Sequence, residues 1–312
     1  MRLRRLILII IASALTCACV KSEMDGNAIS FEPVSSKPTK AIITGTEYPT
    51  SESFVVSAYH NGTDAYFTDL TASYQSSISL WETSTPEYWP LAGSLTFQAY
   101  SPATAGLTID ASGVSVDGYT VQTTEQMTTD LCYGSATVAD CSAHPDAVPL
   151  VFSHALSQVV FRVKAAEYYS NVTLSLNSLS LGGVYSVGNF SAGTWSDHSS
   201  KHDYTISSSP LTLTYTGEEP DVTEISAYLF LPQTLAADAV MNIGYSITQT
   251  VSGTDYSVEN PPKAYALKTT TVTEWEAGKK YIYTINVGLN NLITFTASAK
   301  AWNEQDGGFV VE

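Results

Sequence analysis

Short runs in which apolar and polar residues alternate recur along most of this 312-residue chain, and no stretch of the sequence has extended helical periodicity. In residues 280–289, for example, Tyr281, Tyr283, Ile285 and Val287 fall on one side and mostly polar residues on the other. Successive side chains of a strand point to opposite faces, so this period of two predicts strands with one buried face. Only 14% of the residues are charged while tyrosine alone numbers 19, a composition typical of half-buried strands rather than solvated helices. The sequence therefore predicts an all-β fold.

A break in the strand pattern near residue 148 indicates how the chain divides. Pro145 and Pro149 come before a new alternating run. Domain boundaries tend to fall in such connections, and the length of the chain is enough for two domains. We therefore predict two β-sandwich domains, spanning residues 41–147 and 148–312.

Three local patterns make finer predictions. Ile29 and Phe31 alternate with polar neighbours, which predicts a short strand ahead of an exposed linker. Residues 225–235 are nearly all apolar, which predicts a strand in the middle of a sheet. Gly182 and Gly183 follow alternating leucines and predict a turn between two strands.

The first 18 residues have the layout of a secretory signal. Three arginines precede ten mostly apolar residues, a run too short to cross a bilayer core of about 30 Å as a helix. Cys19 follows Ala18 in an arrangement that resembles a bacterial lipobox, in which the cysteine is lipidated and becomes the first mature residue. We therefore predict a lipoprotein signal peptide over residues 1–18, lipidation of Cys19, and a polar tether or propeptide over residues 19–40. The alternative is a soluble secreted protein that is cut nearby.

The charge of the chain narrows the range of its partners. The formal net charge is −16; removing residues 1–18 takes away three of the 14 basic residues, which leaves 11 against 30 acidic ones, or −19. Such an acidic surface repels nucleic-acid phosphates and anionic lipid headgroups. We therefore expect neither nucleic-acid binding nor a basic membrane-binding patch.

Cys132 and Cys141 are the two cysteines left in the mature chain besides Cys19. An even pair in an exported protein suggests a disulfide, and the residues between them could form a hairpin that brings the two thiols together. Two buried free thiols are the alternative. His144 lies nearby in the sequence, but a zinc site needs more ligands than this stretch offers.

Residues with catalytic or ligand chemistry do not form a recognisable motif, so we expect no enzymatic activity, no cofactor and no metal. Asp197, His198, His202 and Asp203 lie in a serine-rich stretch that is typical of a solvated loop. His154 lies in an apolar run and is expected to be a satisfied core residue. The tryptophans could stack on sugars if they were exposed, although core packing is the favoured interpretation. The five tryptophans are Trp81, Trp89, Trp195, Trp275 and Trp302.

Five stretches taken together resemble the fimbrillin family, the pilin subunits of type V pili in Gram-negative gut and oral anaerobes. Each stretch is a weak signal alone, and their order and spacing make the likeness specific. The stretches are YWPLAGSLTFQAYSPA (88–103), TDLCYGSA (129–136), VPLVFSHALSQVVFRV (148–163), YLFLPQTL (228–235) and WEAGKKYIYTINV (275–287).

The resemblance implies two tandem transthyretin-like β-sandwich domains, export as a lipoprotein, and assembly by donor-strand exchange. A sandwich that lacks one strand leaves an apolar groove and unpaired backbone edges, which a strand from a neighbouring subunit can fill. Such a contact does not close when it is repeated head to tail, so it grows a filament. The implied partners are other fimbrial subunits, either copies or paralogues, and a receptor on a host or bacterial surface.

In this family a protease cuts after a basic residue and releases an N-terminal strand that had filled the groove. Residues 28–34 are the candidate for that strand. The family pattern has arginine at the cut, whereas the linker here offers only Lys37, which precedes a proline, and Lys40. The resemblance therefore implies cleavage between Lys40 and Ala41, and the equal alternative is an uncut subunit that stays anchored through Cys19.

The C-terminal end is the implied source of the donor strand. Residues 293–299 alternate but suit the last strand of their own domain, whereas residues 307–312, GGFVVE, begin with a glycine pair and could be donated or merely frayed. The resemblance thus implies a surface-exposed outer-membrane lipoprotein that forms part of a fimbrium and supports adhesion. The alternative on the same fold is a lipid-anchored surface adhesin or glycan-binding protein that does not polymerise.

Overall fold

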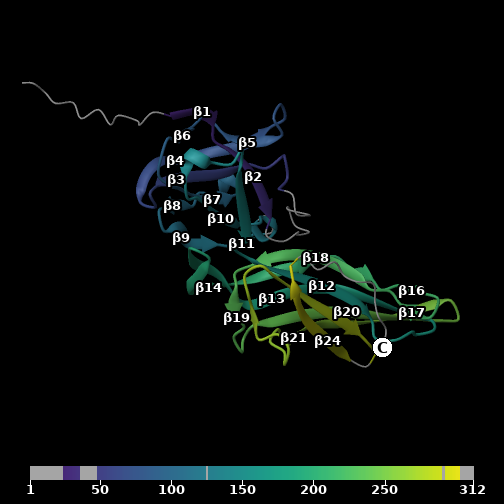
Figure 1. Ribbon diagram of the computed structural model, residues 1–312. Coiled ribbons are helices and arrows are strands. Elements are labelled where there is room, and N and C mark those ends of the chain that lie inside the picture. The colour runs from purple at the N-terminus through teal and green to yellow at the C-terminus, as the bar shows by residue number, and fades with distance from the viewer. Residues whose placement is uncertain (1–23, 36–47, 124–125, 290–291, 303–312) are drawn as a thin grey trace, which may run out of the picture.

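The computed structural model describes residues 24–35, 48–123, 126–289 and 292–302, and every long element in these ranges is a β-strand. Figure 1 shows two lobes, with the N-terminal strands in the upper one and the C-terminal strands in the lower one. The all-β prediction is confirmed. Within the described ranges no helix is long and apolar enough to span a membrane. The only helical turns described are η1 (Ala103–Ala105), η2 (Gln126–Thr128) and η3 (Cys141–Ala143).

Seven strands of the upper lobe close into a barrel, in the order β10-β11-β2-β5-β4-β3-β7 (Figure 1). We call this the barrel lobe. The closed barrel differs from the predicted β-sandwich, because β2 joins the edge of β5 to the edge of β11. The strands β1 and β6 form a separate two-stranded ribbon. The barrel lobe comprises β1 (Met24–Ala28), β2 (Ser30–Ser35), β3 (Phe54–His60), β4 (Asp64–Gln75), β5 (Leu80–Thr83), β6 (Tyr88–Pro90), β7 (Leu95–Ser101), β10 (Cys132–Val138) and β11 (Val148–His154).

The second lobe contains two larger sheets that share one hydrophobic core. One sheet has the order β18-β12-β23-β24, and the other has the order β21-β20-β13-β9-β8, with β14 and β15 also paired to β13. Two short ribbons, β16 with β17 and β19 with β22, complete the lobe. Its strands are β8 (Thr108–Asp110), β9 (Gly113–Thr120), β12 (Ser157–Ala165), β13 (Val172–Ser191), β14 (Thr194–Ser207), β15 (Leu211–Thr212), β16 (Tyr215–Thr216), β17 (Glu219–Pro220), β18 (Thr223–Phe230), β19 (Gln233–Thr234), β20 (Val240–Val251), β21 (Thr254–Ala266), β22 (Glu274–Trp275), β23 (Lys279–Val287) and β24 (Ile293–Ala301).

The boundary between the lobes differs from the predicted division at residues 147 and 148. β11 begins at Val148 but pairs with β10 and β2, so the chain leaves the barrel only between His154 and Ser157. The hairpin of β8 and β9 lies within residues 41–147, yet β9 pairs with β13 of the second lobe. Alternation along a strand reports its buried face, but it does not report which sheet supplies its neighbour.

Two finer predictions about the second lobe are wrong. β13 runs through Gly182 and Gly183 without a turn, and its register with β14 shifts there instead. Gly183 has a φ of +73°, and a Cβ at this position would lie 2.1 Å from the carbonyl oxygen of Asp238, so the bulge requires glycine.

The first part of the apolar run of residues 225–235 lies in β18, which is an edge strand and not a central one. Leu229 and Phe230, which point to opposite faces, are nonetheless both buried, and the short helix η2 contacts the strand. Burial of both faces explains the apolar sequence without a second neighbouring strand. The prediction that β24 is the last strand of its own sheet is confirmed, because β24 pairs with β23 along its whole length.

Candidate functional site

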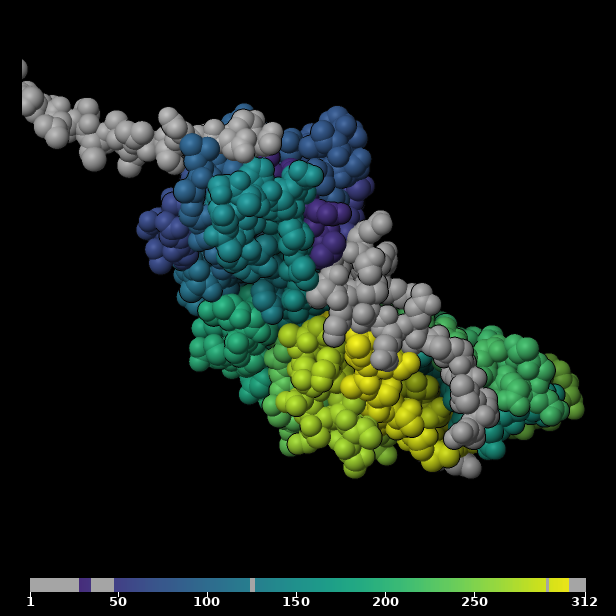
Figure 2. Space-filling model, in the orientation of Figure 1, coloured from purple at the N-terminus to yellow at the C-terminus, as the bar shows by residue number. Residues whose placement is uncertain are grey.

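The N-terminal strand β2 lies in the barrel wall between β11 and β5. Both strands come later in the sequence; β11 runs parallel to β2, and β5 runs antiparallel to it. β2 pairs in parallel with β11, from Phe31 opposite Val148 to Ser35 opposite Phe152, and antiparallel with β5 through Ser30 and Phe31. Figure 2 shows the purple atoms of this segment on the surface of the upper lobe, near the second lobe. Without β2 the edges of β11 and β5 would both be unpaired. We call the place between these two edges, which β2 fills, the seat of β2.

The inward face of β2 carries the apolar residues that the alternation predicts. Ile29, just before β2, and Phe31 within it are buried and Glu32 is exposed, so the prediction of a short alternating strand is confirmed. Phe31 meets Phe54 and Phe97 edge to face, with ring centroids 5.7 and 5.5 Å apart. Aromatic pairs of this kind add about 0.5–1.5 kcal/mol to the burial of their area. The barrel interior therefore holds β2 mainly through one phenylalanine.

Polar contacts hold the start of this strand. The backbone N–H of Ile29 donates to the carbonyl of Glu87 at 2.7 Å, and the Ser30 hydroxyl donates to the carbonyl of Asp146 at 3.1 Å. Ser30 is buried as well, which the alternation did not predict, because its hydroxyl reaches this carbonyl. These contacts set the register of β2 in its seat.

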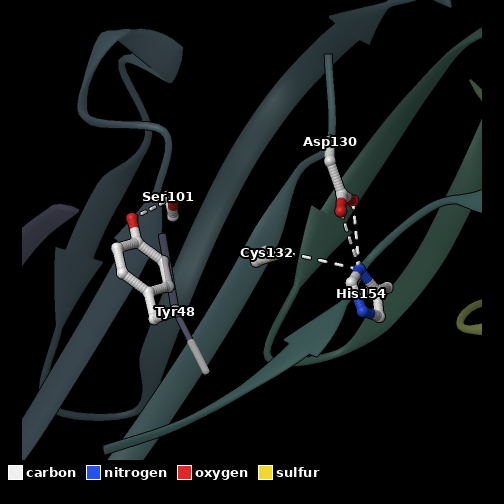
Figure 3. Close-up of polar contacts among 5 residues, drawn as sticks. All are labelled: Tyr48, Ser101, Asp130, Cys132 and His154. Atoms are coloured by element: carbon white, nitrogen blue, oxygen red, sulfur yellow. Dashed lines mark hydrogen bonds and ion pairs between the residues drawn. The ribbon is translucent and has the colours of Figure 1, made fainter. Parts of the chain in front are cut away.

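Tyr48 lies where the described chain resumes after β2, and its ring forms part of the floor of the seat. The ring stacks on Phe152 with centroids 5.3 Å apart, and the hydroxyl lies 2.7 Å from Oγ of Ser101 and donates to the carbonyl of Ser53 at 3.1 Å (Figure 3). Burial raises the pKa of Tyr48 above its ordinary value, so the side chain is neutral at physiological pH.

A buried polar cluster of Asp130, Cys132 and His154 lies at the base of the barrel (Figure 3). Oδ1 of Asp130 is 3.1 Å from Nδ1 of His154, so the carboxylate accepts and Nδ1 carries the proton. Oδ2 lies 2.9 Å from the same nitrogen but has no hydrogen-bond donor of its own. Sγ of Cys132 lies 3.4 Å from Nδ1, and the ring of Trp302 stacks on the imidazole at 4.4 Å. Trp302 follows β24, so this cluster is where the two lobes meet.

The thiol of Cys132 is not a nucleophile in this environment. Burial raises its pKa well above the ordinary value, and the negative charge of Asp130 raises it further. The thiolate, not the thiol, is the reactive form of cysteine. These surroundings therefore favour the neutral thiol of Cys132.

A cleft of about 420 Å³ lies between the outer face of β10 and β11 and the turns of the second lobe. Its volume is in the range of about 300–1,000 Å³ that is typical of small-molecule sites. Polar and apolar surface contribute about equally to the lining, through hydroxyl groups, backbone, one tyrosine ring and the aliphatic side chains of Val114, Val151 and Ala192. The lining residues are Gln98, Ser112, Gly113, Val114, Tyr133, Gly134, Ser135, Val151, Ser153 and Ala192.

Several predicted site residues lie outside the described ranges. These are the lipidation residue Cys19 and the residues of the predicted cut, Lys40 and Ala41. The same holds for the proposed donor residues 307–312.

The predicted disulfide between Cys132 and Cys141 is not present, and both cysteines are free and buried. The residues between them form the strand β10, not a hairpin that folds back. Seven residues of strand span about 20 Å, whereas the Cα atoms of a disulfide lie within about 7 Å. The alternative of two buried free thiols describes the structure.

The histidine-rich stretch also differs from its predicted form. Asp197, His198, His202 and Asp203 lie on the strand β14 and not in a loop. Residues four apart on a strand are about 13 Å apart, so the two imidazoles cannot share an ion. His198 instead donates through Nε2 to the carbonyl of Pro232 at 2.6 Å.

The tryptophans confirm the expectation of core packing. Trp81, Trp89, Trp275 and Trp302 are buried, and Trp195 is half-buried and donates to the carbonyl of Ala155. None of the five therefore presents an open ring face on which a sugar could stack.

The polar cluster is the feature that the sequence analysis missed. His154 was predicted to be a satisfied core residue, which is correct for its burial but omits its two neighbours. Cys132 and His154 are directly opposite each other in the antiparallel pair of β10 and β11. The only local signal is the spacing of Asp130 and Cys132, which places both on one side of a strand.

The fold of the chain recurs in solved structures. A fimbrial protein from Bacteroides vulgatus ATCC 8482 matches with a TM-score of 0.65 and 16% identity, over 88% of this chain and 99% of that one. A candidate cell adhesion protein from Bacteroides ovatus ATCC 8483 matches with a TM-score of 0.54 and 15% identity, over 90% and 99% of the two chains. At these identities the likeness shows the shared fold.

The sequence itself matches a family model over most of its length. Among curated proteins none matches the chain. The model described as fimbrillin-like matches residues 39–302, which include the barrel strands from β3 onward and the whole described second lobe. The resemblance found in the five sequence stretches is thereby confirmed, and the chain belongs to the fimbrillin-like family.

Proposed function

We propose that this chain is a structural or accessory subunit of cell-surface fimbriae that accepts a donor strand from a neighbouring subunit in place of β2. The observation that carries the proposal is the seat of β2, a strand from the N-terminal end that closes the barrel between β11 and β5. Membership of a family of fimbrial proteins supports assembly with other subunits.

Removal of β2 would be energetically unfavourable unless another strand took its place. Loss of β2 would leave two backbone edges without hydrogen-bond partners and would expose Phe54, Phe97 and Phe152 to water. A strand from a neighbour with apolar residues at alternate positions would restore both the ladder and the burial. Repetition of this contact would extend the assembly, because the donor and the acceptor are different surfaces.

Cleavage between Lys40 and Ala41 is the step that we propose frees β2. The strand ends at Ser35, so this bond lies beyond it in the sequence. After the cut only non-covalent contacts would hold β2. An uncut subunit would keep β2 and stay attached through the lipid on Cys19, which describes an anchor or accessory role.

The C-terminal end supplies the proposed donor. β24 pairs with β23 over nine residue pairs and is therefore in use in its own sheet. The residues that follow Trp302 and end in GGFVVE are then the proposed donor segment.

Other fimbrial subunits, either copies or paralogues, are the partners in this proposal. The subunit would reach the outer membrane through lipidated Cys19 and would act at the cell surface without catalysis, with a host or bacterial receptor as the target of adhesion. The description as two tandem transthyretin-like domains belongs to the same proposal, with the N-terminal one closed by β2.

Limited digestion of the mature chain with a lysine-specific protease tests the proposal. We expect a cut after Lys40, release of the N-terminal fragment on mild heating, and then ladders that resist SDS. Lys40→Gln should abolish the cut and the ladders, whereas Lys37→Gln should leave both unchanged. Cleaved protein that loses its N-terminal fragment and remains a monomer would contradict strand exchange.

A second candidate, a surface adhesin that does not polymerise, is favoured by the cleft between the lobes. Its hydroxyl groups and the ring of Tyr133 suit a small polar ligand such as a saccharide. Saccharide binding by the monomer that Tyr133→Ala abolishes, together with no ladders after cleavage, would select this function.

A further inference from the structure

We propose that Asp130, Cys132 and His154 form a binding site for one divalent transition-metal ion, and that zinc is the metal that suits it best. The three residues offer one oxygen, one sulfur and one nitrogen atom, all within 4.8 Å of one another, and all three side chains are buried. This mixed donor set matches the preference of zinc for cysteine, histidine and carboxylate ligands.

The spacing of the ligand atoms is close to that of a tetrahedral zinc site. Bonds of about 2.0–2.3 Å to zinc place neighbouring ligand atoms about 3.3–3.6 Å apart. Nδ1 of His154 lies 3.4 Å from Sγ of Cys132, and 2.9 and 3.1 Å from the two oxygens of Asp130. An ion would therefore require the carboxylate to move outward by only about 0.5 Å.

The charges of the cluster also balance around a divalent cation. A buried carboxylate is costly unless its charge is compensated, and Oδ2 of Asp130 has no hydrogen-bond donor. Zinc bound to the carboxylate, the thiolate and a neutral imidazole has a net charge of zero. Binding would release the proton on Sγ and move the imidazole proton from Nδ1 to Nε2, so the affinity should rise with pH.

The fold holds the ligands in place before any ion arrives. Cys132 and His154 face each other across β10 and β11, and Asp130 lies just before β10. Trp302 stacks on the imidazole with an interplanar angle of 17° and fixes its orientation. Three protein ligands leave one of the four positions of a tetrahedral ion for water.

The competing explanation is a hydrogen-bonded cluster that stabilises the barrel without metal. It predicts that added metal changes neither the absorption spectrum nor the stability of the protein. The two explanations therefore differ in solution.

Cobalt titration of the full chain tests the site, with Cys17 and Cys19 replaced by serine so that only the two buried thiols remain. The protein is first stripped with a chelator. We expect cobalt to saturate at one equivalent with the thiolate charge-transfer absorption of a tetrahedral site, and excess zinc to remove that absorption. Zinc should also raise the midpoint of thermal unfolding, since a ligand that binds the native state stabilises it.

Cys132 and Cys141 provide a matched pair of variants. Cys132→Ser should abolish the charge-transfer absorption and the zinc-induced shift, whereas Cys141→Ser should leave both unchanged. Asp130→Asn keeps the thiol and should weaken cobalt binding by more than about tenfold, which tests the site even if Cys132→Ser fails to fold. No absorption in the parent protein, or an absorption that persists in Cys132→Ser, would overturn the proposal.

Discussion

Phe31 is the single side chain on which the hold of β2 on the barrel depends most. It is fully buried and meets two other phenylalanine rings edge to face. Glu32, its neighbour on the same strand, is exposed. Substitution of Phe31 measures how much the buried side chain stabilises β2 in the barrel. Substitution of Glu32 is the control, because it leaves the backbone hydrogen bonds of the strand in place.

Phe31→Ala should lower the free energy of unfolding by about 3–5 kcal/mol, because it leaves a cavity among the rings of the barrel. Glu32→Ala, on the outer side of the same strand, should change it by less than about 0.5 kcal/mol. Urea unfolding of the uncut protein measures both. Equal effects of the two substitutions would show that the aromatic face does not hold β2.

Tyr281 predicts how the stability of the second lobe depends on alkaline pH. Burial raises its pKa to about 12, although the N–H of Glu276, which donates to its hydroxyl, lowers that value in part. In the unfolded chain the pKa is about 10. Because the folded-state pKa is the higher one, the contribution to stability is complete below about pH 10 and is lost as the pH rises toward 12.

Urea midpoints measured from pH 8 to pH 12 should therefore fall, and the fall should be less steep in Tyr281→Phe. Tyr256→Phe, at an exposed position on β21, is the control and should follow the parent curve. Parallel curves for the parent and Tyr281→Phe would contradict the assignment.

Among the elements, β13 shows how a single glycine, Gly183, allows one strand to pair with several neighbouring strands. Its first part pairs with β20 and its last part with β9, while β14 pairs with it on both sides of the glycine pair. The positive φ of Gly183 provides the bulge at which the register shifts. The sequence predicted a turn here because a bulge and a turn use the same residue type.

Gly183→Ala should destabilise the protein by more than about 2 kcal/mol, because its Cβ would meet backbone at an unfavourable φ. Gly182→Ala is the matched control; its Cβ would lie 3.2 Å from a carboxylate oxygen of Asp203, a side chain that can move. Thermal unfolding of the two variants gives the comparison. A Gly182→Ala variant as unstable as Gly183→Ala would show that the bulge is not the cause.

At the scale of the whole molecule, the two lobes are connected by more than the peptide between them. The hairpin of β8 and β9 extends from the N-terminal half into the second lobe, and the hydroxyl of Tyr59 donates to Ile109 of this hairpin at 3.1 Å. Tyr133 of β10 packs against Phe190 of β13 with ring centroids 5.2 Å apart. Any single division of the chain into two fragments would therefore break contacts between the lobes.

A fragment that begins at Val148 should not reach the stability of the second lobe in the intact chain. It lacks β8 and β9, so the end of β13 has no partner on that side, and it carries β11 without its barrel. We expect a lower thermal midpoint and a tendency to associate through the unpaired edge. An unchanged midpoint, measured against the intact protein, would show that the second lobe folds independently.

By itself the sequence determined the all-β class, the buried face of several strands and the family. Phe31 in β2, and the residues from Tyr281 to Val287 in β23, were predictable because the direction of a side chain depends only on its own strand. The family was predictable because five short stretches keep their order along the chain.

Only the tertiary structure decided which edges meet. The closure of the barrel by β2, the place of β8 and β9 in the second lobe, the edge position of β18 and the free state of Cys132 all depend on pairs of strands far apart in the sequence. The convergence of Asp130 and Cys132 on His154 depends on the register of β10 against β11. Alternation is a local property, whereas strand pairing depends on hydrogen bonds and packing across whole sheets, and it leaves no signal in any one segment.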